Sequence, residues 1–394
     1  MATRTGLAIG VDASLLRGKS APALQGDYSA GQALDTLLRG SGLQWSLSGE
    51  NSIVVQPAPV AVDLGSAPMA LSETLVTASR SEASIASIPG TVQVIEAPQI
   101  AQQSAAGRKV ADILGTLVPG LAPSSGTMSN YGQTLRGRSV LVLIDGVSQN
   151  ASRDVSRQLN SVAPSSIERI EVVSGASSLY GAGASGGIIN IITRRNDGQA
   201  LAMSSRVGLS SADNFNHKGF AYEGFQSVTG RQDALDWYLS ADLVQRNDQF
   251  DGNGKRIPQE AFQGSNMDTE SHDLHAKFGY DLDDQRRTSL ALQEYEDKQD
   301  TGYVAGTRNG ESVAIKGLQL SDQPFTHNQA VNFNYSDNDL FGHRLLLESY
   351  WRKQQARFFP YNWGNNAGVV ASESDARVYG LRAAVESSLP SIGS

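Results

Sequence analysis

Residues 272–282 read HDLHAKFGYDL, and this stretch decides the fold class of the chain. Every second residue from Leu274 to Leu282 is apolar, and His, Lys, Gly and Asp lie between them. The same alternation occurs in 235–245 and in 376–386. A period of two residues is typical of a β-strand with one apolar and one polar face. The stretch therefore predicts half-buried antiparallel strands.

Eight strands of this kind are predicted from residue 200 onward, and the connections between them alternate in length. Short turns at one end of a sheet and long loops at the other are typical of an outer-membrane β-barrel. A soluble β-sandwich is the alternative for regular strands, but the alternation holds over three hairpins and favours the barrel. The predicted strands are 201–209, 219–228, 235–245, 272–282, 287–297, 327–337, 343–356 and 376–386, with short connections at 229–234, 283–286 and 338–342 and long ones at 246–271, 298–326 and 357–375.

The composition narrows the possible functions. The 394 residues carry a formal net charge of −8, which argues against a general nucleic-acid partner. The chain has no cysteine, so thiolate metal sites and cysteine catalysis are excluded. No apolar run approaches the ~20 residues that a membrane-spanning helix needs. The five histidines show no spacing typical of metal ligands, and no metal site is predicted.

Residues 1–55 are predicted to form a small α+β domain. A strand at 7–11 is followed by a helix that begins at the capping-box pair Ser29 and Gln32, and two short strands complete the domain. No charged segment followed by an apolar core precedes it, so no signal peptide is predicted and we expect the true N-terminus to lie upstream. Residues 56–79 are rich in Pro and Ala and predict a linker.

Residues 80–195 are predicted to form a second compact unit with mixed α and β structure. The apolar spacing of 110–117 predicts a helix, which Pro119 and Gly120 end. Strands are predicted around 92–95, 139–145, 167–173 and 188–193. An eight-stranded barrel is only wide enough for its own side chains. If this unit lies inside the barrel, residues 196–394 form only its first part, and we expect the chain to be truncated at both ends.

Three stretches, in order along the chain, resemble the TonB-dependent outer-membrane siderophore receptors. The stretch ETLVTA resembles their TonB box. The stretch from 134 to 147 (TLRGR…LIDGV) and that from 167 to 193 (IERIEVV…YG…GGIINIIT) resemble their plug domain. Residues 7–55 resemble the secretin and TonB N-terminal short domain of signalling members. The resemblance implies an α+β plug and a small α+β signalling domain ahead of an antiparallel transmembrane β-barrel, with eight of about 22 strands present. The TonB-binding residues that it implies are Glu73, Thr74, Leu75, Val76, Thr77 and Ala78.

Within this family, residues 152–159 and 174–181 are most similar to receptors of the ferric-aerobactin type, which take up citrate-hydroxamate siderophores. The resemblance implies TonB-driven uptake of such a ferric complex across the cell outer membrane, with the signalling domain and the TonB box in the periplasm. It also implies TonB, with its inner-membrane energising complex, and an anti-sigma regulator as partners, the latter through residues 1–55. The siderophore would chelate the iron, so no cofactor bound by the protein is expected. Many relatives carry Arg where this chain has Ser174, and a role for that charge is not carried over.

Two sets of residues are candidates for the function. The first is a plug charge cluster, in which we expect Arg136 and Arg169 to pair with plug or barrel carboxylates and hold the plug in place. The second set would bind an anionic siderophore through guanidinium groups and aromatic rings. The charge cluster comprises Arg136, Arg138, Glu168, Arg169 and Glu171, and the ligand candidates are Tyr131, Arg153, Arg157, Tyr303, Arg308, Phe358, Phe359, Tyr361 and Trp363.

Other readings remain open. The same machinery could carry haem, cobalamin or a glycan, and a barrel of this kind could belong to a non-transporting binding or adhesion protein. An enzyme is disfavoured because no acid/base or nucleophile constellation stands out. GAGASG at 181–186 matches a dinucleotide fingerprint, and GASGG at 183–187 matches a nucleophile elbow. Both motifs need a helix to follow, and a strand is predicted there instead.

Overall fold

The computed structural model divides the chain into two compact units, residues 1–73 and 74–394, and the division falls in the predicted linker. Each unit is described by itself. None of the helices in the described ranges is long and apolar enough to cross a membrane. The structure describes residues 8–11, 21, 23–24, 26, 28–38, 41, 43–49, 52–57, 75–76, 83–84, 90–150, 157–175, 183–212, 217–259, 265–359, 361–362, 369–370 and 372–387.

The first unit is the small α+β domain that the sequence predicts. Strand β3 (Ser52–Pro57) lies between β1 (Ala8–Val11), which is parallel to it, and β2 (Leu43–Gly49), which is antiparallel. Helix α2 (Ala30–Leu38) begins at the predicted capping box. The Gln32 amide donates to Ser29 Oγ at 3.3 Å, and the Ser29 amide donates to Gln32 Oε1 at 3.1 Å.

The predicted plug, residues 80–195, contains a five-stranded sheet in the order β6-β9-β10-β7-β8. Strands β10 and β7 are parallel, and the other neighbours are antiparallel. The predicted strands and the predicted helix α4 are present. The elements are β6 (Thr91–Glu96), α3 (Ala97–Ser104), α4 (Val110–Leu117), β7 (Val140–Ile144), β8 (Val147–Ser148), β9 (Ile167–Ser174) and β10 (Gly187–Thr193), with 3-10 turns η3 (Gln158–Asn160) and η4 (Pro164–Ser166).

Helix α3 is an element that the sequence analysis did not predict. Its sequence, APQIAQQS, has only Ile100 as a large apolar residue, which is too few for a helical period to be recognised. The helix instead depends on its first turn, where Glu96 and Gln99 form a capping box and Pro98 occupies an early position that suits proline. Ile100 is fully buried in the plug core.

The apolar run of β7 is explained by burial on both faces of the plug sheet. Val140, Val142 and Ile144 belong to the main core, which also contains the apolar residues of α4. Leu141 and Leu143 belong to a second cluster with Ile188. Strand β10 begins at Gly187. A strand therefore follows these glycines, where a dinucleotide-binding motif or a nucleophile elbow would need a helix.

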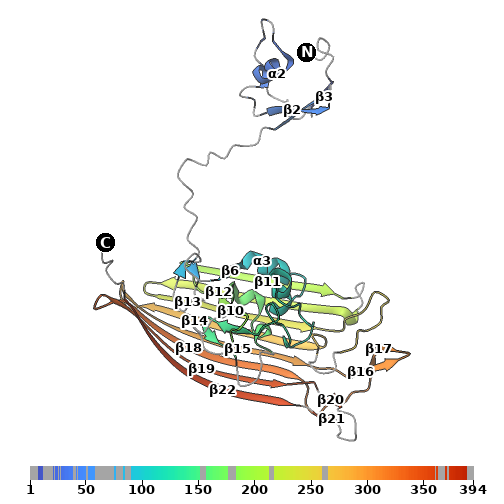
Figure 1. The fold of residues 1–394 in the computed structure, drawn as a ribbon, viewed down its shortest axis with the longest axis vertical. Helices are drawn as coiled ribbons and strands as arrows, with labels where there is room; N and C mark the ends of the chain where they lie inside the picture. The colour runs from blue at the N-terminus through green and yellow to red at the C-terminus, as the bar shows by residue number, and fades with distance from the viewer. Residues whose placement is uncertain are drawn as a thin grey trace. The chain divides into compact units, whose positions relative to one another are not determined.

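The region after residue 200 forms an antiparallel sheet of eight strands in sequence order, as predicted (Figure 1). The plug lies against one face of this curved sheet, which we call the inner face. Apolar side chains such as Leu243, Leu274 and Leu381 are exposed on the outer face. The strands are β11 (Leu201–Ser211), β12 (Phe220–Gln232), β13 (Leu235–Arg246), β14 (Thr269–Asp281), β15 (Arg286–Gln299), β18 (Phe325–Leu340), β19 (His343–Arg357) and β22 (Glu373–Glu386).

The predicted alternation of connection lengths is also present. Strands β12 and β13, β14 and β15, and β18 and β19 are joined by short turns at one end of the sheet, the turn end. The other connections of the predicted series are long and lie at the opposite end, the loop end. The long loops contain two hairpins that the sequence analysis did not predict. They pair β16 (Tyr303–Arg308) with β17 (Glu311–Lys316), and β20 (Tyr361–Asn362) with β21 (Val369–Val370).

Candidate functional site: the interface between plug and strands

Three buried carboxylates on neighbouring strands face the plug. Asp242 lies on β13, Asp273 on β14 and Asp297 on β15. Asp242 is directly opposite Asp273 in the β-sheet register, and Asp273 is opposite Tyr295. A buried carboxylate needs hydrogen-bond donors or a cation. The plug supplies a different partner to each of the three carboxylates. These contacts join the plug to the inner face of the sheet.

Lys109 supplies the partner of Asp297. It occupies the N-cap position of α4, and its ammonium forms an ion pair with the Asp297 carboxylate. Their side chains are only 7 % and 2 % exposed, respectively. Burial lowers the pKa of Lys109, Asp297 opposes that shift, and the nearby Arg246 guanidinium lowers the pKa further, so the net shift is downward. The first turn of α4 is therefore joined to β15 by a buried ion pair.

The segment just before β9 is held by the other two carboxylates. The Ala163 amide donates to Asp273 Oδ2 at 2.6 Å, and the Ser165 hydroxyl donates to Asp242. From β15, Gln293 donates to the Ser161 carbonyl at 3.0 Å. The two hydrogen bonds to Asp273 and Asp242 join neutral donors to charged acceptors, and each contributes about 1.5–3 kcal/mol.

Nearer the turn end, Asp145 of the plug pairs with Lys277 of β14 at 2.9 Å. Asp145 follows β7 with a positive φ of 48° and precedes Gly146. It also accepts hydrogen bonds from the Thr193 amide at 2.9 Å and the Thr193 hydroxyl at 2.7 Å. Burial by itself raises the pKa of Asp145, but Lys277 and Thr193 outweigh burial and hold the pKa below its ordinary value.

This downward pKa shift predicts how the contact depends on pH. A carboxyl with a depressed folded-state pKa stabilises the fold fully above its unfolded value of 3.8, and the contribution is lost as pH falls through the folded-state pKa. We expect Asp145→Asn to weaken the plug by about 2 kcal/mol, equally at pH 5 and pH 8. Hydrogen exchange of the β7 and β10 amides would measure it, with the exposed Asp197→Asn as control. An effect that disappears at pH 5 would contradict this assignment.

At the loop end, two arginines join the plug to β18 and β19. Arg352 of β19 donates to the carbonyl oxygens of Gln149, at 3.0 Å, and Asn150. Arg157 of the plug donates to Thr326 Oγ1 at 2.9 Å and lies over the Phe358 ring, 4.8 Å from its centroid. Burial lowers the pKa of Arg157 to about 10, so its guanidinium stays charged at neutral pH.

The five residues of the predicted charge cluster do not lie together. Arg169 pairs with Glu168 at 2.6 Å and with Glu171 at 2.9 Å, so these three form a group on β9. Arg136 and Arg138 are exposed in the turn before β7. That turn lies near Gly187 at the start of β10, whereas Arg169 is opposite Ile192 near its end. The length of β10 therefore separates the two parts, and the plug-to-strand ion pairs use Lys109 and Asp145 instead.

The six predicted ligand-binding residues whose side chains the structure describes fall into three groups. Arg157, Phe358 and Phe359 are buried, and the Arg157 guanidinium lies over the Phe358 ring. Tyr303 is covered by Arg256, whose guanidinium lies 3.9 Å from the ring centroid and pairs with Asp248 and Asp268. Tyr131 and Arg308 are exposed. Arg153 and Trp363 lie outside the described residues, as do the side chain of Tyr361 and residues Glu73, Thr74, Thr77 and Ala78.

Leu75 and Val76 of the TonB-box-like stretch form the short strand β4 (Leu75–Val76), which pairs antiparallel with β5 (Ala83–Ser84). The backbone of these two residues thus adopts the extended conformation that β-forming residues favour. An extended segment can add to the edge of a partner's sheet through main-chain hydrogen bonds.

The residues that join plug and sheet were not predicted from the sequence, although one pattern indicates some of them. On β13, alternate residues from Trp237 to Leu243 are apolar and face outward, so Asp242 must face inward. The same parity places Asp273 and Lys277 on the inner face of β14. Lys109 carried no such pattern, because its partner lies on a strand far along the chain.

Comparisons with known proteins agree with this architecture. Residues 84–188 match the TonB-dependent receptor plug domain, and residues 7–58 match the secretin and TonB N-terminus short domain. The ferric enterobactin receptor of Pseudomonas aeruginosa, at 17 % sequence identity, has the same fold with a TM-score of 0.56, over 79 % of this chain and 48 % of that chain. The chain belongs to the TonB-dependent receptors, a family of transporters and receptors.

Two curated relatives define the similarity more closely. The rhizobactin receptor of Rhizobium meliloti is 33 % identical over 353 residues, which are 86 % of this chain and 46 % of that protein. The ferric aerobactin receptor of Klebsiella pneumoniae is 33 % identical over 330 residues, 79 % of this chain and 44 % of that protein. The chain thus spans about half the length of the curated relatives that it matches.

Proposed function

We propose that the chain functions in the uptake of a ferric siderophore of the citrate-hydroxamate type across the outer membrane. The observation that carries the proposal is the plug, which rests on the inner face of the strands through separate polar contacts. Such contacts can close a passage and yet be broken one at a time by a pulling force. The similarity to rhizobactin and ferric aerobactin receptors supports this cargo class. Vitamin B12 transporters are also similar, at 29 % identity over 67 % of the chain, so cobalamin is the alternative cargo.

The proposal includes two protein partners. TonB would bind residues 73–78 and transmit force from its inner-membrane complex. Residues 1–55 would relay ligand occupancy to an anti-sigma regulator. Both the signalling domain and the TonB box would then lie in the periplasm. The iron would enter and leave as part of the chelate, so the protein itself would hold no metal or cofactor.

The test is uptake of radioactive iron as ferric aerobactin by iron-starved cells whose other siderophore receptors are deleted. We expect uptake with this receptor, and its loss in Val76→Pro, because proline removes a main-chain donor that strand addition needs. Surface binding should persist, and Val76→Ala should transport normally. Uptake of labelled cobalamin or haem, but not of ferric aerobactin, would refute the proposed cargo. Uptake unaffected by Val76→Pro would refute the proposed TonB contact.

A further inference from the structure

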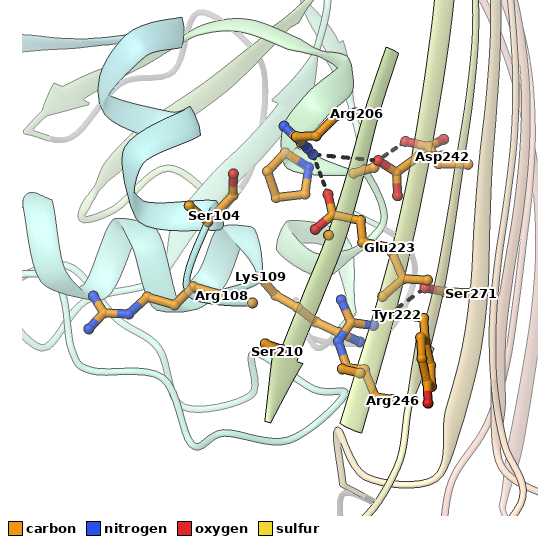
Figure 2. A pocket seen from close by; sticks show the side chains of 18 of the residues that line it. Ser104, Arg108, Lys109, Arg206, Ser210, Tyr222, Glu223, Asp242, Arg246 and Ser271 are labelled. Carbon is orange, nitrogen blue, oxygen red and sulfur yellow. Dashed lines mark hydrogen bonds and ion pairs between the residues drawn. The ribbon is translucent and has the colours of Figure 1, made fainter. Parts of the chain in front are cut away.

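A cavity of about 350 Å³ lies between the plug and the inner face of β11–β14 (Figure 2). The plug contributes the end of α3, the residues just before α4 and residues near η4, and the sheet contributes residues of β11 to β15. The volume corresponds to about a dozen water molecules. It is at the lower end of the range of ligand pockets, about 300–1,000 Å³, so the cavity suits part of a bulky chelate rather than a whole one.

The charged side chains in this cavity differ in whether they have an oppositely charged partner among the described residues. In its deeper part, Arg206 pairs with Glu223 and lies 4.0 Å from Asp242. Nearer the loop end, Lys109 and Arg246 lie close enough for the guanidinium to lower the pKa of the ammonium. Figure 2 shows Arg246, the last residue of β13, beside Lys109.

Arg246 is a cation without a counter-charge in the part of the chain that the structure describes. Its guanidinium donates a long hydrogen bond of 3.4 Å to Ser271 Oγ and has no carboxylate within ion-pair distance among those residues. Asp297 is bound to Lys109 and forms no ion pair with Arg246. Among the described residues, the Arg246 guanidinium therefore lines this end of the cavity with donors that no carboxylate accepts from.

A second cavity, of about 430 Å³ at the turn end, provides a comparison within the same molecule. There the cations have acidic partners: Lys277 pairs with Asp145, Arg287 with Asp236, and Arg382 with Glu348. The Arg246 guanidinium, with no carboxylate at ion-pair distance among the described residues, thus distinguishes the first cavity from the second.

We propose that Arg246, with Lys109 beside it, is a subsite for a carboxylate group of the ligand. The proposal rests on the proposed function and adds to it the place where the ligand's acidic part is held. A guanidinium offers two parallel donors that match the two oxygens of a carboxylate. The Ser271 hydroxyl, adjacent to Arg246, supplies a third polar contact. The acidic, already paired part of the cavity beyond Arg206 does not offer a comparable site.

The test compares the receptor with Arg246→Gln, Arg246→Lys and Arg286→Gln, using ferric aerobactin as the first probe. Arg286 is exposed at the turn end and pairs with Asp283, so its loss removes the same charge away from the cavity. We expect the Kd for ferric aerobactin to rise about tenfold or more in Arg246→Gln. Arg246→Lys should recover part of the affinity, because lysine keeps the positive charge but lacks the two parallel donors of a guanidinium. Arg286→Gln should remain within about twofold.

Citrate is the second probe, and its binding to the same variants is measured by calorimetric titration. This probe tests the carboxylate subsite independently of whether ferric aerobactin is the cargo. If the unmodified receptor binds citrate and Arg246→Gln does not, the subsite stands even where ferric aerobactin is not the cargo. If Arg246→Gln matches Arg286→Gln for both probes while the unmodified receptor transports ferric aerobactin, the subsite is refuted and the function stands. If the unmodified receptor binds neither probe, both are refuted.

Discussion

Replacing Lys109 with Met should destabilise the plug by about 3–5 kcal/mol, because it leaves the Asp297 carboxylate buried without its cation. The two side chains are almost inaccessible to solvent. Among the described residues, the Tyr295 hydroxyl, 3.4 Å away, is the one donor that Asp297 would keep. The loss would be measured by hydrogen exchange of the α4 amides in the receptor reconstituted in lipid bilayers.

A double-mutant cycle distinguishes the ion pair from loss of packing. When both partners become apolar, as in Lys109→Met with Asp297→Leu, much of the lost stability should return, since no charge remains buried. Lys298→Met is the matched control, because Lys298 is exposed on the opposite face of the same strand, and it should change stability by less than about 0.5 kcal/mol. If the double variant were as unstable as Lys109→Met alone, the buried pair would not be the source of the effect.

Alternating hydrophobicity was sufficient to predict the eight strands, because successive side chains of a strand point to opposite faces of the sheet, and in strands such as β13 the outer face is apolar. The 110–117 helix was predictable for a related reason, since its apolar residues recur at helical spacing and lie in the plug core. Helix α3 was not, because its stability comes from a capping box and a proline rather than from an apolar stripe. Local sequence therefore predicts elements whose burial is periodic.

The polar contacts of the site were harder to predict, because a charged residue carries no sign of which partner it will meet. Arg157 illustrates the difficulty. Its sequence position suggested a ligand contact, whereas the structure shows it buried against Thr326 and Phe358. Arg246 illustrates the converse, since nothing in its local sequence distinguished it from an ordinary residue at a strand end. Only the arrangement of distant segments shows that Arg157 is buried against two strand-end residues and that Arg246 lines a cavity.

Gly187→Ala should be among the most damaging single substitutions in the plug, with an expected loss of about 3 kcal/mol or more. Gly187 begins β10 between β9 and β7, opposite Ser174 and Val140, with a φ of 150°. A Cβ atom there would lie 2.3 Å from the Val173 carbonyl oxygen. Because that oxygen belongs to the backbone of the neighbouring strand, relief requires the strands to separate.

Gly198→Ala is the informative control for this substitution. Gly198 also has a positive φ, of 94°, but a Cβ atom there would meet no other atom within 4 Å. It should therefore show only the conformational cost, about 1–2 kcal/mol. Hydrogen exchange of the β9 and β10 amides would compare the two variants. If the two variants lose equal stability, backbone conformation alone makes glycine necessary at position 187. If Gly187→Ala loses more, the close approach of β9 and β10 makes glycine necessary there. The plug sheet then cannot admit a side chain where it meets the turn before β7.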